Sequence, residues 1–547
     1  MVVMTEHPVD GGLPTVSLPL DIYTAHPKDP SNTTSDWSYT ESRASTPDLD
    51  GATPRTWDEK ASSEGREKQD DNSLVGIGLL PDDVYDRTMS SWRAAIRRRV
   101  RANVEWESKV IANMQERVRR PILDNYFVYT SSLGTHTFFM ITLPAFAFFG
   151  RVDVARGLLM VLALGVYVAS FVKDLVCAPR PFAPPVARLT MGNHHLEYGF
   201  PSTHSTNSVS IALFFFQLLH RLYKTPVPST MVSTTTYYML SGVLLFYMFS
   251  IVYGRLYTGM HSFTDCIMGV SLGAAIWALS LVCSDGLHDW IRDSGWIVPV
   301  VVIPLCLLLV HWHPQPIDDC PCFEDAIAFV SVIMGEVLSR WYMLHYGYDD
   351  SYFVRVMPGC IWGGWVDMFT WWSMAVVKMV LGILIIFMWR IFAKTVMHTV
   401  LPPIFRLLSQ AFTLPHRRFY TPATDYKNVP PEKGLHPIPS VIDLPSMIEM
   451  EMDGGGSSGA SLAAPGGIYG QYNMKLRGSK GRDKSASSMS EKKVGLGFDM
   501  EEYAGKQDEV VKHYDADVLT KVVVYSGIGM LACGLIPVLF EVLGWGL

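Results

Sequence analysis

Charged residues are scarce in this chain. Only 18% of its 547 residues are Asp, Glu, Lys or Arg, whereas 49% are hydrophobic. Soluble proteins of this length carry more charge, so the composition indicates a membrane protein. The formal net charge of -7 is spread through polar tails and forms no clustered basic face, which argues against a nucleic-acid-binding protein.

Cysteine is also rare, because the whole chain has only eight. This number in so long a chain excludes the disulfide framework of small secreted domains. Cys320 and Cys322 stand beside Asp318 and Asp319, but no CxxC or HxxxH pair completes a tetrahedral set of metal ligands. We therefore expect neither a metal nor a cofactor.

The chain does not open with a basic start followed by an apolar core, so we expect no signal peptide and insertion through internal spans. Residues 1–80 are rich in Ser, Thr, Pro, Asp and Gly and have no helical or strand period, which predicts a disordered tail. Residues 415–516 have a similar composition, with Gly/Ser-rich and Lys/Ser-rich stretches, and are predicted to form a disordered linker.

Nine apolar segments are close to the roughly 20 residues that a helix needs to cross a bilayer. They are 127–149, 154–176, 205–222, 235–254, 262–283, 296–312, 324–344, 368–392 and 519–541. The predicted fold is all-α: a polytopic helix bundle of about eight or nine transmembrane helices, with a catalytic domain over 122–414 and a last helix over 517–547. The segment 324–344 contains four charged residues and is tilted, buried in the bundle or not a span.

Residues 81–121 have a different pattern. Apolar residues recur every three to four positions from Tyr85 to Val118, which predicts an amphipathic helix. Between them stand Arg93, Arg97, Arg98, Arg99, Arg101, Arg117, Arg119 and Arg120. Such a helix lies on a membrane surface or packs against its own protein, and the sequence leaves both readings open.

Three polar segments adjoin the ends of apolar ones. They are 173–181 (KDLVCAPRP), 200–205 (FPSTHS) and 253–265 (YGRLYTGMHSFTD). Ionisable groups beside membrane spans are costly and indicate a functional site. Because the two spans between residues 205 and 254 cross the membrane and return, all three segments are predicted to share one membrane face.

These segments supply the parts of a phosphate-binding site. Lys173, Arg180 and Arg255 are three cations, and a guanidinium matches two phosphate oxygens at once. Ser202 and the backbone amide of Thr203 begin a helix, where unpaired N–H groups bind anions. We expect these five residues to bind a phosphate group.

Two histidines and a carboxylate can carry out the reaction on that phosphate. His261 and Asp265 are four residues apart and share a helix face, so the carboxylate can orient the imidazole as it attacks phosphorus. His204 is then available to protonate the leaving oxygen. The set predicts phosphoryl transfer without a metal, because the cations spread the negative charge of the transition state.

The spacing of these residues resembles the three-part signature of the PAP2 (type 2 phosphatidic acid phosphatase) superfamily. The three parts are Lys173 with Arg180-Pro181, Pro201-Ser202-Thr203-His204, and Arg255 with His261 and Asp265. Within the superfamily, the chain most resembles fungal dihydrosphingosine 1-phosphate phosphatases and other phosphatases of sphingoid long-chain base 1-phosphates. That likeness lies in EYGFPSTHS (197–205), YGRLYTGMHSFTD and HPQPIDDCPCFED (313–325).

The resemblance implies a multi-pass enzyme of the endoplasmic reticulum membrane that needs no metal. It implies a phosphohistidine at His261, an orienting Asp265 and an acid at His204, with the phosphate held by the cations and Ser202. The superfamily often has Ser where this chain has Gly254, which would remove a hydroxyl from the site. It often has Gly where this chain has Thr203, which adds bulk.

The predicted function is hydrolysis of dihydrosphingosine, phytosphingosine or sphingosine 1-phosphate to the free base and phosphate. Glu197 is a candidate contact for the sphingoid amine, the alternative being a solvated loop carboxylate. Two other functions use the same nucleophile: a glycerolipid phosphate phosphatase and a lipid phosphotransferase. A more distant alternative is a non-catalytic protein that binds or moves anionic lipids. The partners expected are the lipid substrate and the bilayer, without nucleic acid, and the oligomeric state is left open.

Two arguments disagree on which membrane face carries the site. The positive-inside rule places the basic helix 81–121, and with it the site, in the cytosol. The family resemblance places the site in the lumen of the endoplasmic reticulum. Glycosylation at Asn32, in the sequon NTT, would report a lumenal N-terminus.

Overall fold

The computed structural model describes residues 76–134, 136–189, 197–224, 232–348, 352–360, 363–426 and 513–546. Most of the tail predicted over 1–80 and of the linker predicted over 415–516 lies outside these ranges. Asn32, the residue of the glycosylation sequon, also lies outside the described residues.

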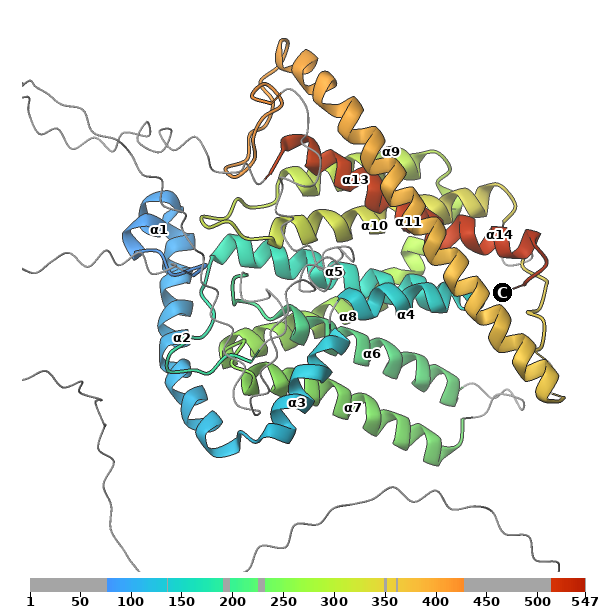
Figure 1. Ribbon diagram of the computed structural model, residues 1–547, viewed down its shortest axis with the longest axis horizontal. Coiled ribbons are helices and arrows are strands. Elements are labelled where there is room, and N and C mark those ends of the chain that lie inside the picture. Colours follow the sequence, from blue (N-terminus) through green and yellow to red (C-terminus); the bar gives the residue numbers. More distant parts are fainter. Residues whose placement is uncertain are drawn as a thin grey trace, which may run out of the picture. The chain divides into compact units, whose positions relative to one another are not determined.

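The described part of the chain is built from helices (Figure 1), which confirms the predicted all-α fold class; its only β pairing is one isolated bridge between Thr421 and Tyr514. The helices up to the site are α1 (Asp82–Thr88), α2 (Ser91–Val118), α3 (Pro121–Thr130), η1 (Ser131–Gly134), α4 (His136–Phe148), α5 (Val152–Val176) and α6 (Thr203–Lys224). Those that follow are α7 (Thr234–Tyr257), α8 (Phe263–Asp293), α9 (Ile297–His311), α10 (Cys322–His345), α11 (Trp365–Ser409), α13 (Asp515–Met530), η4 (Leu531–Leu535) and α14 (Ile536–Val542).

Five helices of the described residues are long and apolar enough to cross a bilayer. They are α5, α7, α8, α11 and the continuous run from α13 to α14. The other predicted spans are helical as well, but α4 and α9 are short and α6 and α10 carry more polar residues. The predicted count of eight or nine spans is therefore not established, whereas the multi-pass character is.

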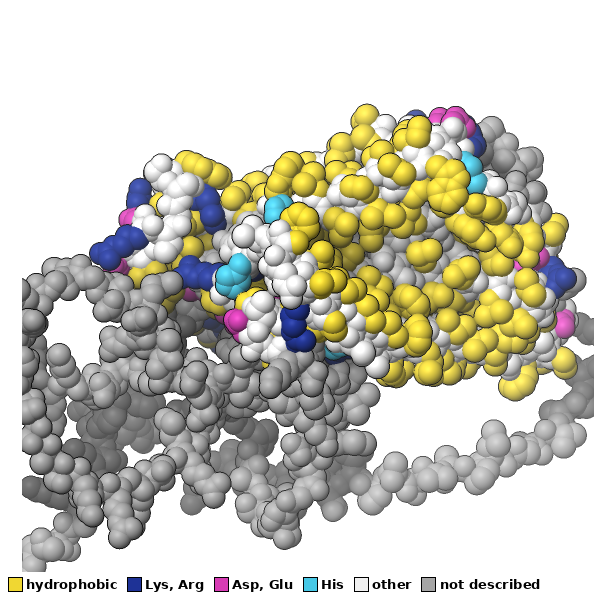
Figure 2. Space-filling model, turned by 90° about the horizontal axis from the view of Figure 1, so that it is seen from above, with side chains coloured by type: hydrophobic (Ala, Val, Ile, Leu, Met, Phe, Trp, Pro, Cys, Tyr) yellow, Lys and Arg dark blue, Asp and Glu magenta, His cyan; other side chains and the backbone are white. Residues whose placement is uncertain are grey.

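Large apolar side chains cover most of the face of the bundle seen in Figure 2, and dark blue Lys and Arg side chains gather at the end where α1 and α2 lie. Exposed examples are Phe246 on α7, Val282 on α8, Val300 on α9 and Phe369 on α11. An apolar surface of this extent on a folded protein marks contact with another apolar phase, here the bilayer.

Helix α10 corresponds to the weakest predicted span, and two of its charged residues are paired inside the bundle. Glu324 lies 2.7 Å from the Nζ of Lys521 on α13. Glu336 lies 3.5 Å from the Nε of Arg156 on α5. Of the three readings of this segment, burial within the bundle is the one that the structure supports.

Helix α2 runs across the end of the bundle (Figure 1) and packs its apolar stripe of Val100, Val104 and Ile111 against the protein. Two of its arginines donate hydrogen bonds to backbone carbonyls at the end of α5. Arg93 donates to the carbonyls of Asp174 (2.9 Å) and Leu175 (2.8 Å), and Arg97 donates to that of Cys177 (3.2 Å). The last carbonyls of a helix lack partners within it, so these arginines cap the turn that carries Lys173.

Helices α6 and α8 lie in close contact because α8 presents two glycines to α6. A Cβ atom at Gly269 would lie 2.6 Å from the carbonyl oxygen of Ser202, and one at Gly273 would lie 2.3 Å from that of Thr206. Small residues four apart allow helix backbones to approach in this way. The starts of α6 and α8 are thereby held together, and the amide of Ser202 donates to the carbonyl of Asp265 (3.1 Å).

We predict that Gly273→Ala destabilises the bundle, because the new methyl group would overlap a backbone carbonyl that cannot rotate away. Overpacking of this kind costs about 1–3 kcal/mol. Gly286→Ala is the matched control on the same helix, since a Cβ there would meet nothing within 4 Å. Thermal unfolding in detergent, followed by circular dichroism, should show a lower midpoint for Gly273→Ala alone. Equal midpoints for the two variants would contradict this account of the α6–α8 contact.

Candidate active site

The three polar segments of the sequence meet at one end of the bundle. Arg180, in the loop after α5, lies 3.2 Å from the ring of His261, measured from Nη1 to Nε2. Ser202, at the start of α6, is bonded to Asp265 on the first turn of α8. Residues that are far apart in sequence thus surround one buried point, as the expected return of the chain across the membrane requires.

His261 lies between α7 and α8 and is only 2% exposed. Its Nδ1 is 3.0 Å from the carbonyl oxygen of Gly199. A carbonyl can only accept a hydrogen bond, so Nδ1 carries the proton and Nε2 holds the lone pair. That lone pair faces the guanidinium of Arg180, the group expected to bind phosphate. The ring is therefore oriented as a nucleophile requires.

The charge environment keeps this imidazole neutral. Burial, followed by the positive charges of Arg180, Lys173 and Arg255, lowers the pKa of His261 well below its ordinary value. A neutral imidazole has the lone pair that nucleophilic attack needs. Protonation would place a fourth positive charge beside three buried cations, which explains the direction of the shift.

Asp265 does not form the hydrogen bond to His261 that their four-residue spacing suggests. Its Oδ2 is 3.6 Å from the Nδ1 of His261, too far for a hydrogen bond, and it accepts from the amide of Ser262 at 2.8 Å. Ser262 accepts in turn from the amide of Asp265, which forms a capping box at the start of α8. The hydrogen bond that orients the ring comes from Gly199, and the role of Asp265 as an orienting partner stays a prediction.

The cations are buried, and Arg180 is held in place by backbone atoms. Arg180 donates to the carbonyls of Glu197 (Nε, 2.9 Å) and Met260 (Nη1, 2.9 Å). Arg255, on the last turn of α7, is 5% exposed, and its Nε finds no hydrogen-bond partner among the described residues. A buried donor without a partner has an unmet need that an anion would satisfy.

Glu197 forms ion pairs with two of these cations. Its Oε2 is 2.7 Å from the Nζ of Lys173 and 3.7 Å from Nη2 of Arg180. Glu197 is therefore not a solvated loop carboxylate: it lies among the groups expected to bind the phosphate. Whether it contacts a substrate amine stays a prediction, but its position is within reach of the phosphate site.

The first turn of α6 provides the remaining predicted residues. The hydroxyl of Ser202 accepts hydrogen bonds from the amide (3.3 Å) and the hydroxyl (3.0 Å) of Ser205. Among the described residues, the buried Oγ1 of Thr203 has no hydrogen-bond partner. His204 follows it and is partly buried.

Helix α2 contributes side chains to the site that the sequence reading missed. The carboxylate of Glu107 accepts from the amide (3.0 Å) and the hydroxyl (2.5 Å) of Thr264, at the start of α8. Gln115 donates to the carbonyls of Ala187 (2.8 Å) and Tyr257 (2.9 Å). A signal was present: both are polar residues at helical spacing on the apolar stripe of α2.

Two further features were not foreseen. Arg188 adds a cation near Arg180, and burial together with that neighbouring charge lowers the pKa of Arg188 to about 10, which leaves it positive at neutral pH.

Gly254 faces α3, where a Cβ atom would lie 3.1 Å from Cδ1 of Phe127. A serine at 254 would thus point toward Phe127, so the expected loss of a hydroxyl from the site does not follow from this replacement.

Comparisons with known proteins agree with the resemblance seen in the sequence. The family model described as "PAP2 superfamily" matches residues 155–288. A dihydrosphingosine 1-phosphate phosphatase of Schizosaccharomyces pombe is 35% identical over 348 residues, which cover 62% of this chain and 79% of that protein. A dihydrosphingosine 1-phosphate phosphatase of Saccharomyces cerevisiae is 33% identical over 278 residues, covering 50% of this chain and 67% of that protein. The crystal structure of Aquifex aeolicus LpxE matches 32% of this chain and 92% of its own, with 23% identity and a TM-score of 0.25.

We predict that Glu107→Ala loosens the start of α8 and weakens the binding of vanadate, a phosphate analogue, by about tenfold. The reason is that the loss of a hydrogen bond to a charged group costs about 1.5 kcal/mol. Glu105→Ala is the matched control, since Glu105 is exposed on the same helix. Calorimetric titration of the purified chain measures both affinities. Unchanged vanadate binding by Glu107→Ala would show that α2 does not support the site.

Proposed function

Because the chain belongs to the PAP2 superfamily and is a lipid phosphate phosphatase, we propose that its substrates are the 1-phosphates of sphingoid bases. The products are the free base and inorganic phosphate. The observation that carries the proposal is the placement of His261, whose Nε2 faces Arg180 while its Nδ1 is held by the Gly199 carbonyl. The sphingoid part of the proposal rests on the names of the two fungal relatives and on the position of Glu197.

The first step forms a bond between Nε2 of His261 and phosphorus. Lys173, Arg180 and Arg255, with Ser202 and the amide of Thr203 at the start of α6, bind the phosphate oxygens and stabilise the charge of the transition state. The bond between phosphorus and the lipid oxygen breaks as His204 protonates that oxygen. The imidazole becomes a cationic phosphohistidine, which the nearby charge of Asp265 stabilises.

The second step returns the enzyme to its starting state. His204, now neutral, takes a proton from water, and the hydroxide attacks phosphorus. The bond between phosphorus and Nε2 breaks, so that His261 is again neutral and inorganic phosphate leaves. Neither step needs a metal, because the buried cations carry out the charge stabilisation that a metal ion gives in other phosphoryl transfers.

Glu197 gives a physical reason for a substrate with an amine. A sphingoid base phosphate carries its ammonium group on the carbon next to the one that bears the phosphate. When the phosphate binds Lys173, the Glu197 carboxylate loses that partner and can pair with the ammonium instead. A glycerolipid phosphate such as phosphatidic acid has no ammonium there and would leave the carboxylate facing a second anion, which is unfavourable.

We further propose that the enzyme resides in the membrane of the endoplasmic reticulum, the location that the family resemblance implies. The apolar face of the bundle supports a membrane location in general.

We predict that His261→Ala abolishes phosphate release from dihydrosphingosine 1-phosphate and that His204→Ala lowers it by roughly 100- to 10,000-fold, the usual contribution of a general acid. His311→Ala is the control, because His311 is an exposed histidine at the end of α9. Release is measured as inorganic phosphate in the presence of EDTA. If His261→Ala and His204→Ala retained the parent rate, the proposed roles would be wrong.

The same assay separates hydrolysis from the related reactions. Parallel incubation with phosphatidic acid reports a glycerolipid phosphatase, and an added lipid alcohol that becomes phosphorylated reports a phosphotransferase. A protein that only binds or moves lipids would release no phosphate from either substrate.

We predict that Glu197→Gln lowers kcat/KM for dihydrosphingosine 1-phosphate by about tenfold, since it removes a charged partner of the ammonium worth about 1.5 kcal/mol. The value for phosphatidic acid should stay constant or rise, because the amide no longer competes for Lys173. Glu105→Gln, on the exposed face of α2, is the control. An equal loss on both substrates would mean that Glu197 only positions the cations.

A further inference from the structure

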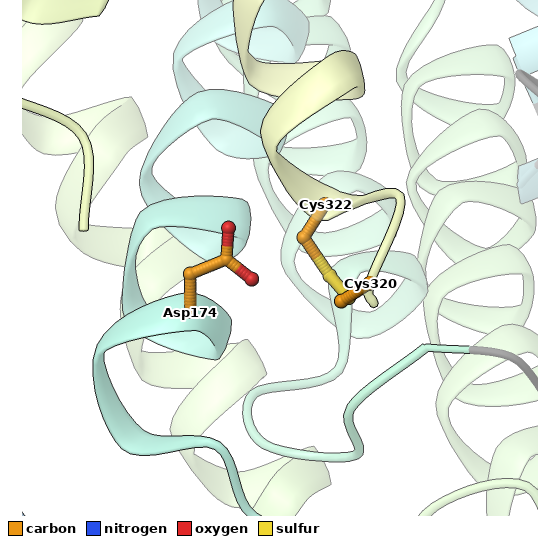
Figure 3. Close-up of side chains that lie close together, drawn as sticks. All are labelled: Asp174, Cys320 and Cys322. Carbon is orange, nitrogen blue, oxygen red and sulfur yellow. A yellow bond between two sulfur atoms is a disulfide. The ribbon is translucent and has the colours of Figure 1, made fainter. Parts of the chain in front are cut away.

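A second cluster of polar side chains lies beside the site. Asp174 follows Lys173 on α5, and its side chain is fully buried. Figure 3 shows its carboxylate facing Cys320, which lies just before α10, and Cys322, which is the first residue of α10. An oxygen of Asp174 and the two sulfur atoms lie within 4.8 Å of one another. In this structure the two cysteines form a disulfide.

The carboxylate of Asp174 has no hydrogen-bond donor among the described residues, although both of its oxygens are buried. His313 pairs with this carboxylate: its Nδ1 is 3.5 Å from Oδ2 and also lies 3.1 Å from the carbonyl oxygen of Pro314. The imidazole of His313 is itself buried, and its Nε2 likewise has no hydrogen-bond partner in the described residues. Buried polar atoms are almost always satisfied, so two such groups in contact indicate a missing binding partner.

The neighbouring carboxylates are already occupied. Oδ2 of Asp318 accepts from the hydroxyls of Tyr85 (2.7 Å) and Tyr198 (2.7 Å). Asp319 lies 3.2 Å from Nε2 of His513. The two acids that adjoin the cysteines in sequence therefore face other groups, and the acid that faces the sulfur atoms comes from α5.

We propose that Asp174, Cys320 and Cys322 form a binding site for a divalent metal ion of the zinc class when the two cysteines are reduced, with His313, which lies 3.5 Å from Asp174, moving in as the fourth ligand. Two thiolates, an imidazole and a carboxylate are the ligand types that zinc prefers in four-coordinate sites. The site is separate from the proposed reaction, because none of these four residues contacts the phosphate there. The sequence led us to expect no metal, and this proposal departs from that expectation at the two cysteines; for the phosphate site it stays a prediction.

The chemistry of loading is a reduction followed by an exchange. A dithiol reductant gives two electrons and two protons to the disulfide and is itself oxidised to a disulfide. The metal ion then replaces the two thiol protons and binds the thiolates. Cys320 also lines a pocket together with Asp319, Glu324, Arg417 and His513, so an ion or a reductant in this pocket would be next to one of the two cysteines.

A purely structural disulfide explains the cluster less well. The bond closes a loop that contains Pro321 alone, and the stabilisation from a disulfide falls as the closed loop becomes shorter. It also leaves both carboxylate oxygens of Asp174 without a hydrogen-bond donor among the described residues, whereas a bound cation would coordinate the carboxylate.

Metal binding by the full-length chain in detergent tests the proposal. The chain is reduced with a dithiol, treated with EDTA and freed of both reagents, and Co²⁺ or Zn²⁺ is then added. We expect about one equivalent of tightly bound metal per chain and, with Co²⁺, the absorption of thiolate-to-metal charge transfer. The double variant Cys320→Ser/Cys322→Ser should lose both signals, and Asp174→Asn should bind at least tenfold more weakly.

The control variant is Cys283→Ser/Cys360→Ser, which removes two exposed cysteines outside the cluster and should bind metal like the parent. A measurement on the parent chain avoids variants that fail to fold: bound Zn²⁺ should protect Cys320 and Cys322 from alkylation, as read by mass spectrometry, and reoxidation should release the ion. The absence of tight binding by the reduced parent, or binding that persists without Cys320 and Cys322, would overturn the proposal.

Discussion

The structure depends on keeping several positive charges close together in a buried place before any substrate arrives. Lys173, Arg180 and Arg255 surround His261, and each would be costly to bury alone. The protein offsets this with Glu197 on two of the cations and with backbone carbonyls around Arg180. Because the helix starts of α6 and α8 also point here, their dipoles add to the positive potential that a phosphate would meet.

The residues that hold this site in place are not the ones that contact the phosphate in the proposed reaction. Arg93 and Arg97 cap the end of α5, Glu107 holds the start of α8, and Gln115 joins two loops. All four belong to α2. The sequence leaves open whether this helix lies on a membrane surface or packs against its own protein. In the structure α2 packs against the protein and holds the loops that carry the cations, which explains why Arg97, Glu107 and Gln115 are buried.

The sequence was sufficient to predict the helical fold and the meeting of the three segments. The length of each apolar segment and the number of membrane crossings between two segments can both be counted along the chain. It could not show that Gly199 holds the ring of His261, since a carbonyl partner has no residue signature. It could not show that Asp174 faces Cys320 and Cys322, since that contact depends on how α5 packs against α10. The number of spans could not be read from the sequence either, because the pairing of Glu324 and Glu336 inside the bundle depends on how α10 packs.

The ion pair between Glu197 and Lys173 bears on how the enzyme ends a turnover. Inorganic phosphate is a small, highly charged product, and a set of buried cations with no other partner would retain it. In the proposed reaction, a Glu197 carboxylate that returns to Lys173 would compete with the product for that cation. The residue that partly offsets the positive charge of the site would then also limit product inhibition, so that the site could select phosphate without retaining it.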